Sequence, residues 1–206
     1  MLRSSASVVA ATGVISGVTA ASRAGLFSVR ALAASPATFA DGRVWLLVTS
    51  ALLADRPAAA SVLGFFLVGL AAVHLCGPRI AWIAASGGHI LSALAVYVAL
   101  GLARMADPGA AAGVFHLPDY GTSAVIAAWI GAIGYRLWHR GRRPAAVGLV
   151  VAAALAGWYF KGSLTVIDTE HAVALAVGMA AMRFLPAARP RRAGIPHLRL
   201  RRGCTI

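Results

Sequence analysis

The chain alternates between long apolar stretches and short polar connections. Six stretches carry few or no charges, and a membrane-spanning helix needs about 20 apolar residues. Tyr135, Trp138, Trp158 and Tyr159 are predicted to anchor the shorter fourth and fifth stretches at the membrane interface. We therefore predict six transmembrane helices, at residues 7–22, 57–77, 80–103, 120–135, 144–160 and roughly 163–182.

Two apolar segments allow more than one interpretation. Residues 1–22 combine a basic start, a modest apolar core and small residues, so they fit either a retained span or a cleaved signal peptide. The distribution of positive charge favours the retained span. Residues 44–54 are apolar but too short to cross a bilayer, so they are predicted to be re-entrant, interfacial or a buried helix.

Composition supports the same class of protein. Of the 206 residues 60% are hydrophobic and 12% are charged, and the mean hydropathy is +0.79. This balance predicts an all-α polytopic membrane protein rather than a soluble one. We expect one membrane domain over residues 1–186, followed by a basic tail at 187–206 that is rich in proline and arginine and predicted to be disordered.

Positive charge is concentrated at few places. The net charge is +13, and arginines cluster at 136–143 and from Arg183 onward. Beside membrane spans the positive-inside rule explains such clusters, so we predict no nucleic-acid partner and place both termini in the cytoplasm. The tail is expected to contact anionic lipid headgroups, at about 1 kcal/mol per basic residue near the surface. Low lysine with abundant alanine, arginine and glycine hints at a bacterial plasma membrane.

Two polar side chains stand near the starts of the fourth and sixth predicted spans. Ser123 follows Gly121 and Thr122, and His171 is followed by small residues at Ala174 and Gly178. In a topology with both termini inside, Ser123 and His171 lie at the outer end of the bundle at similar depth. Taken singly, Ser123 fits a packing serine or a helix N-cap, and His171 fits an interfacial histidine bonded to a neighbouring acid or water.

The remaining candidate groups predict no cofactor and no metal site. Cys76 and Cys204 are far apart and are interpreted as free thiols. The six histidines show no metal-ligand spacing. His89 falls in the middle of the third span and is predicted to be a hydrogen-bonded interhelical residue.

The order of these motifs resembles the rhomboid family of intramembrane serine proteases. Gly121-x-Ser123 is similar to the Gly-x-Ser motif that opens the family's fourth span. His171-x-x-Ala174-x-x-x-Gly178 resembles the sixth-span motif, with alanine at its first glycine. Segments 37–53, 86–97 and 157–159 resemble the region before the second span, the third span and the end of the fifth, so the similarity covers about residues 35–185.

The resemblance implies a rhomboid-like bundle of six transmembrane helices with a Ser–His dyad. Ser123 would attack a peptide bond at the outer edge of a single-span membrane substrate, and His171 would accept the hydroxyl proton. Gly121 and Thr122 would supply backbone support for the oxyanion. Ala174 and Gly178 would let the two helices pack closely.

Departures from the family pattern keep a second function open. Alignment through Cys76 places Phe65 and Gly69 where the family has two hydrogen-bond donors for the oxyanion. Loss of one such donor costs about 100- to 1000-fold in rate. The alternative is a pseudoprotease that binds client transmembrane helices. A small transporter is a third class, but we identify no charges lining a path at mid-bilayer.

Overall fold

The computed structural model describes residues 2–54, 56–109, 112–161 and 166–185. Over these residues helices are the only regular elements, joined by loops, and there are no strands. The tail at 187–206, including Cys204, lies outside the described part. Six helices are long, namely α1 (Leu2–Arg23), α4 (Ala58–Cys76), α5 (Pro78–Ala106), α6 (Thr122–His139), α7 (Arg143–Lys161) and α8 (Val166–Phe184), and four are short, namely η1 (Val29–Ala31), α2 (Pro36–Ala40), α3 (Leu46–Thr49) and η2 (Ser50–Leu52).

Each predicted span coincides with one long helix. Three described helices are long and apolar enough to cross a membrane, and these lie at Ser5–Arg23, Ala58–Cys76 and Pro78–Ala106. A shorter apolar helix covers Arg143–Gly157. The structure is therefore that of an all-helical protein with several apolar helices, as a membrane protein requires.

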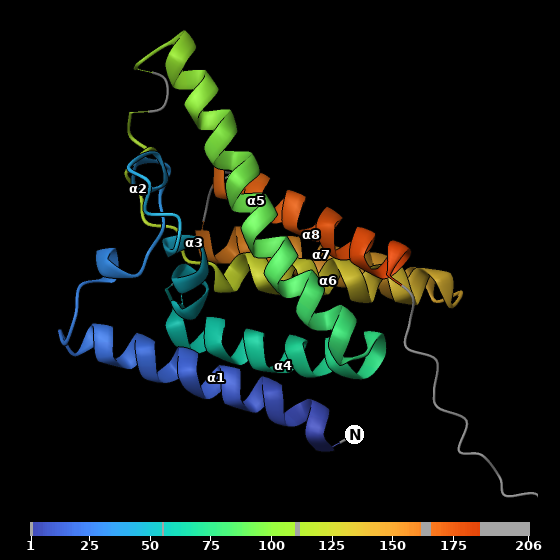
Figure 1. Cartoon of the computed structure of the whole chain (residues 1–206). Coiled ribbons are helices and arrows are strands. Elements are labelled where there is room, and N and C mark those ends of the chain that lie inside the picture. Colours follow the sequence, from blue (N-terminus) through green and yellow to red (C-terminus); the bar gives the residue numbers. More distant parts are fainter. Residues whose placement is uncertain (1, 55, 110–111, 162–165, 186–206) are drawn as a thin grey trace, which may run out of the picture.

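Tight turns set the direction of the long helices. Gly77 between α4 and α5 and Gly141 between α6 and α7 both have positive φ values, 90° and 76°, which only glycine adopts without strain. The chain therefore reverses sharply at both places. As a result α4, α6 and α8 run in one direction and α1, α5 and α7 in the other (Figure 1). Ser123 and His171 lie near the starts of two helices that begin at the same end of the bundle.

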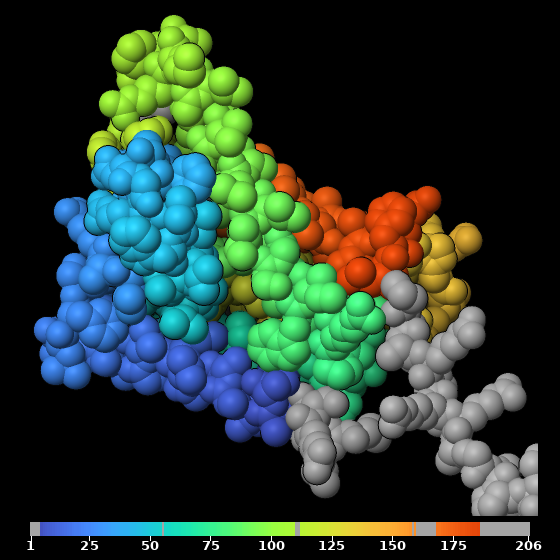
Figure 2. All heavy atoms as spheres, in the orientation of Figure 1, coloured from blue at the N-terminus to red at the C-terminus, as the bar shows by residue number. Residues whose placement is uncertain are grey.

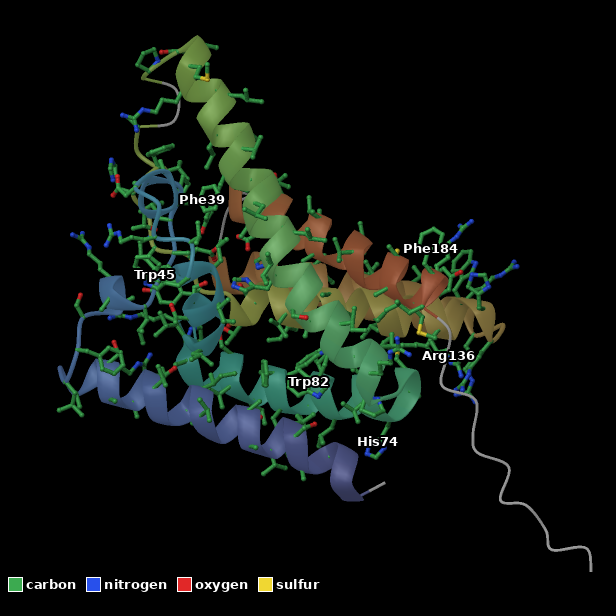
Figure 3. The ribbon with its side chains drawn as sticks, in the orientation of Figure 1. Phe39, Trp45, His74, Trp82, Arg136 and Phe184 are labelled. Atoms are coloured by element: carbon green, nitrogen blue, oxygen red, sulfur yellow. The ribbon has the colours of Figure 1, made fainter. Side chains whose placement is uncertain are left out.

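The two ends of the molecule differ in character. Figure 3 shows Phe39 and Trp45 at the end where α4, α6 and α8 begin, and His74, Arg136 and Phe184 at the opposite end. The first end carries α2, α3 and the connection between α5 and α6 (Figure 1). The second carries the arginines of the turn between α6 and α7.

The centre of the bundle is built on Trp129 of α6. Its side chain is fully buried, and its indole N–H donates to the Ala81 carbonyl at 2.8 Å. Its ring packs against Phe65 of α4 at 4.8 Å and Trp82 of α5 at 5.8 Å between centroids. Three helices therefore meet on one aromatic side chain, and the buried N–H keeps a partner, as a low-dielectric interior demands.

The N-terminal helix is part of this bundle. Val8 and Ile15 of α1 are buried, and the Trp82 indole N–H, on α5 (Figure 3), donates to the Ser7 hydroxyl at 3.0 Å. The Ala54 N–H donates to the Thr19 hydroxyl at 3.2 Å. α1 therefore packs against α5 and against the segment before α4.

The segment between α1 and α4 covers one face of the helices. In Figure 2 this segment, in blue and cyan, lies against α5, in green. Residues 44–54 form the short helices α3 and η2, and Leu46 and Leu47 pack with Tyr97 of α5. Trp45 and Val48 on the other side remain exposed. Of the predicted alternatives, re-entrant, interfacial or buried helix, the structure shows short helices that are buried on one side.

The outer surface of the long helices is apolar. Large exposed side chains include Leu63 and Leu67 on α4, Leu91 on α5 and Val151 and Leu155 on α7. Soluble monomers rarely expose so continuous an apolar surface. In a bilayer these side chains face lipid.

Candidate active site

The closest helix pair carries the two predicted site residues. In the contact between α6 and α8, a Cβ added to Gly178 would overlap the Ala128 carbonyl, and one added to Gly131 would overlap the Leu175 carbonyl. Ala174 is fully buried against α6. The small residues at Ala174 and Gly178 thus lie where the two backbones touch, which is the small-residue packing of membrane helices.

The register of this contact brings the start of α8 level with the start of α6. The two helices are parallel (Figure 1), and Ser123 of α6 and Glu170 of α8 line one cavity of about 50 Å³. Tyr97, Asp119 and Tyr120 also line it. The volume suits a few water molecules and not a peptide segment.

Ser123 is the second residue of α6 and is half-buried. Its hydroxyl donates to the Tyr120 carbonyl at 3.1 Å. His171 lies in the second turn of α8, beside Glu170, and is also half-buried. Within the described residues, the Ser123 hydroxyl is hydrogen-bonded to Tyr120 and not to His171. The Ser–His pairing therefore stays a prediction.

Gly121 and Thr122 hold the start of α6 in place. The Gly121 N–H donates to the Ser50 carbonyl at 3.1 Å, so this group is already occupied and does not face an oxyanion. A Cβ on Gly121 would overlap the His89 ring. The buried Thr122 hydroxyl donates to the Leu53 carbonyl at 3.0 Å. The backbone donors suited to an oxyanion are those of the first turn, before the first intrahelical bond from Val125 to Gly121.

Phe65 and Gly69, the residues aligned with the oxyanion positions, both lie against the Trp129 side chain. Phe65 stacks on Trp129, and a Cβ on Gly69 would press on the same indole. Trp129 is six residues beyond Ser123, about 9 Å along the helix. Phe65 and Gly69 thus pack in the core of the bundle against Trp129, and their alignment with the oxyanion positions stays a prediction.

Contacts between α4 and α6 indicate which α4 residue is level with Ser123. A Cβ on Gly64 would meet the Ile126 side chain at 3.6 Å. Because α4 and α6 are parallel, the residues three positions earlier, Ser61 and Ser123, share one level. Ser61 is half-buried. Ser61 is therefore a further α4 side chain at the level of Ser123.

A buried polar cluster next to Ser123 was missed by sequence reasoning. His89 of α5, Asp119 before α6 and Glu170 of α8 offer one ligand atom each, all within 4.8 Å of one another. His89 and Glu170 are 2% and 5% exposed. Ionisable residues inside predicted spans were the available signal for His89 and Glu170. Asp119 lies in a loop and gave none.

Hydrogen bonds tie the polar cluster to its surroundings. One His89 ring nitrogen, Nε2, is 2.7 Å from the Leu47 carbonyl and 3.1 Å from the Ser50 hydroxyl. The Tyr97 hydroxyl donates to Asp119 Oδ2 at 2.9 Å. The Ser92 hydroxyl donates to Glu170 Oε1 at 3.5 Å. The prediction that His89 is a hydrogen-bonded residue is confirmed, although its partners come from α3 and η2 and not from another span.

These features define an all-helical membrane protein with a polar centre at one end of its helix bundle. No protein-family model, curated protein or solved structure matches this chain.

Proposed function

We propose that this chain is a rhomboid-like intramembrane serine protease, with Ser123 as nucleophile and His171 as general base. One observation carries the proposal. The parallel, closely packed helices α6 and α8 begin at the same end of the bundle, and Ser123 and the neighbour of His171, Glu170, line a single cavity. A serine near a histidine at the level of a polar cavity is the minimum that acyl transfer requires.

In this mechanism the Ser123 side chain rotates about its Cα–Cβ bond. Its hydroxyl then donates its hydrogen bond to His171 in place of the Tyr120 carbonyl. The oxygen then attacks the scissile carbonyl, and His171 takes its proton and passes it to the leaving amine. N–H groups in the first turn of α6 would stabilise the oxyanion, helped by the positive end of the helix dipole. Water would then hydrolyse the acyl enzyme.

The proposal includes the six-span bundle and its orientation. The six long helices would all cross the bilayer, with both termini in the cytoplasm of a bacterial cell and the Ser123 end near the outer face. The substrate would be a single-span membrane protein cut near that face. Arginines at the opposite end and in the tail would contact anionic headgroups.

Fluorophosphonate labelling of the detergent-purified protein tests the proposed dyad. Wild type should label covalently, whereas Ser123→Ala and His171→Ala should not. Ser86→Ala and His74→Ala are matched controls, since both residues are exposed on other helices. Absence of labelling in folded wild-type protein, or undiminished labelling of Ser123→Ala, would refute the proposal.

A second function, the binding of client transmembrane helices without cleavage, is favoured by a specific observation. The Ser123 hydroxyl and the Gly121 N–H both already have backbone acceptors, at 3.1 Å each, as in a resting structural role. Photo-crosslinking from the lipid-facing Leu63 of α4 to membrane proteins, in wild type and Ser123→Ala, separates the two functions. A pseudoprotease should give the same uncleaved crosslinked partners in both, whereas a protease should accumulate them only in Ser123→Ala.

A further inference from the structure

Three titratable side chains from three parts of the chain converge beside the cavity. His89 comes from the middle of α5, Asp119 from the segment before α6, and Glu170 from the first turns of α8. Their ligand atoms lie within 4.8 Å of one another. Two carboxylates this close, that of Glu170 buried and that of Asp119 half-buried, repel each other unless a positive charge or a shared proton compensates them.

The state of His89 is the second, independent observation. Its Nε2 lies 2.7 Å from the Leu47 carbonyl, which accepts hydrogen bonds and cannot donate them, so Nε2 carries the proton. Its Nδ1 is buried and has no hydrogen-bond partner among the described residues. A buried nitrogen lone pair without a donor is rare. A histidine that donates one N–H to a backbone carbonyl and keeps the other nitrogen as a lone pair is the usual form of a metal ligand.

We propose that His89, Asp119 and Glu170 bind a divalent transition-metal cation. One imidazole nitrogen and two carboxylate oxygens form a mixed ligand set of the kind that Zn²⁺ and its first-row neighbours accept. A tetrahedral ion with bonds of about 2.0–2.2 Å sets its ligands roughly 3.4 Å apart. The side chains therefore close inward by about 1 Å or a little more on binding.

The ion would have a structural effect on the end of the bundle that carries Ser123. It would neutralise the carboxylate pair and join α5, the loop before α6 and α8, whose mutual positions set the distance between Ser123 and His171. The Tyr97 hydroxyl would remain the outer hydrogen-bond donor to Asp119. The proposal does not depend on whether Ser123 is reactive.

Metal content and Zn²⁺ affinity of the full chain test this site. The protein is purified in detergent with a tag that lacks histidine, stripped with a chelator and titrated with Zn²⁺. Wild type should bind about one Zn²⁺ per chain and melt at a higher temperature with Zn²⁺. Asp119→Asn and Glu170→Gln, which keep the side-chain shape, should bind at least about 10-fold more weakly, because loss even of an outer partner of a metal ligand costs about 10- to 100-fold.

Matched controls are Asp107→Asn and His116→Ala, which change exposed residues of the α5–α6 connection and should leave Zn²⁺ affinity unchanged. If the ligand variants do not fold, the visible spectrum of Co²⁺ bound to wild type decides. Weak ligand-field bands without thiolate charge transfer support the site and exclude Cys76 and Cys204. The proposal is overturned if wild type binds no Zn²⁺, if the ligand variants bind Zn²⁺ as tightly as wild type, or if the cobalt spectrum shows thiolate bands. In each of these cases a proton shared by the two carboxylates explains the cluster.

Discussion

The contact between α6 and α8 makes a sharp prediction about two glycines. Gly178→Ala adds one methyl group that meets the Ala128 carbonyl, a backbone atom that cannot rotate away. Gly134→Ala adds the same group on α6, where its nearest neighbour would be a Val150 methyl at 3.9 Å. The two variants share the same chemical change and differ in the space around it.

The difference between the variants isolates the cost of overlap. Replacing a helical glycine with alanine gains about 1 kcal/mol in helix propensity, and this gain is common to both. Overpacking costs about 1–3 kcal/mol. Gly178→Ala should therefore be less stable than Gly134→Ala by about 1–3 kcal/mol. At roughly 2–4 °C per kcal/mol for a chain of this size, its melting temperature should be about 2–12 °C lower.

Thermal unfolding in one detergent, followed by a thiol-independent dye, provides the measurement. Fluorophosphonate labelling of the same samples below the transition gives a second readout, because separation of α6 from α8 also separates Ser123 from His171. Gly178→Ala should label less than Gly134→Ala at a temperature where both are folded. Equal melting temperatures for the two variants would show that the backbones of α6 and α8 are not in contact. The proposed closeness of Ser123 and His171 would then lose its structural support.

Three further substitutions test separate parts of the structure. Trp129→Phe removes the indole donor to the Ala81 carbonyl together with part of a fully buried ring, and chemical denaturation should show a loss of about 1–3 kcal/mol. Tyr97→Phe removes the donor to the Asp119 carboxylate and should cost about 1–3 kcal/mol by the same assay, with a fold otherwise retained by circular dichroism. Leu155→Ala on the exposed face of α7 should change stability by no more than about 0.5 kcal/mol, and a core-like loss would contradict its lipid-facing position.

Most of the fold could be predicted because its signals are local. Stretches of apolar residues separated by Gly77-Pro78 and by the basic turn at 140–142 marked the helices and their reversals. The short helices α3 and η2 were predicted as one apolar segment, but the polar contacts that hold them could not be. Those contacts join residues about 40 positions apart, such as Ser50 and His89, and no local pattern encodes such a pairing.

The site was predicted only in part, for a related reason. Small residues at Ala174 and Gly178 indicated a close helix contact because their spacing follows the helical period. The packing of Phe65 and Gly69 against Trp129 could not be predicted, because the depth of a residue depends on which side chains on the next helix it meets. Asp119 escaped notice because a loop carboxylate looks solvated until the fold brings it against Tyr97.

If Ser123 is the nucleophile that we propose, the polar centre also constrains how a substrate could reach it. The cavity there is too small for a peptide, so some element must move to admit one. The segment that contains α3 and η2 is held to the helices by polar bonds, namely His89 to Leu47 and Gly121 to Ser50. Breaking a buried hydrogen bond costs about 1–3 kcal/mol, whereas separating α6 from α8 would dismantle the site itself. Movement of α3 and η2 is therefore the less costly route, and a substrate that offers its own backbone donors and acceptors would recover part of that cost.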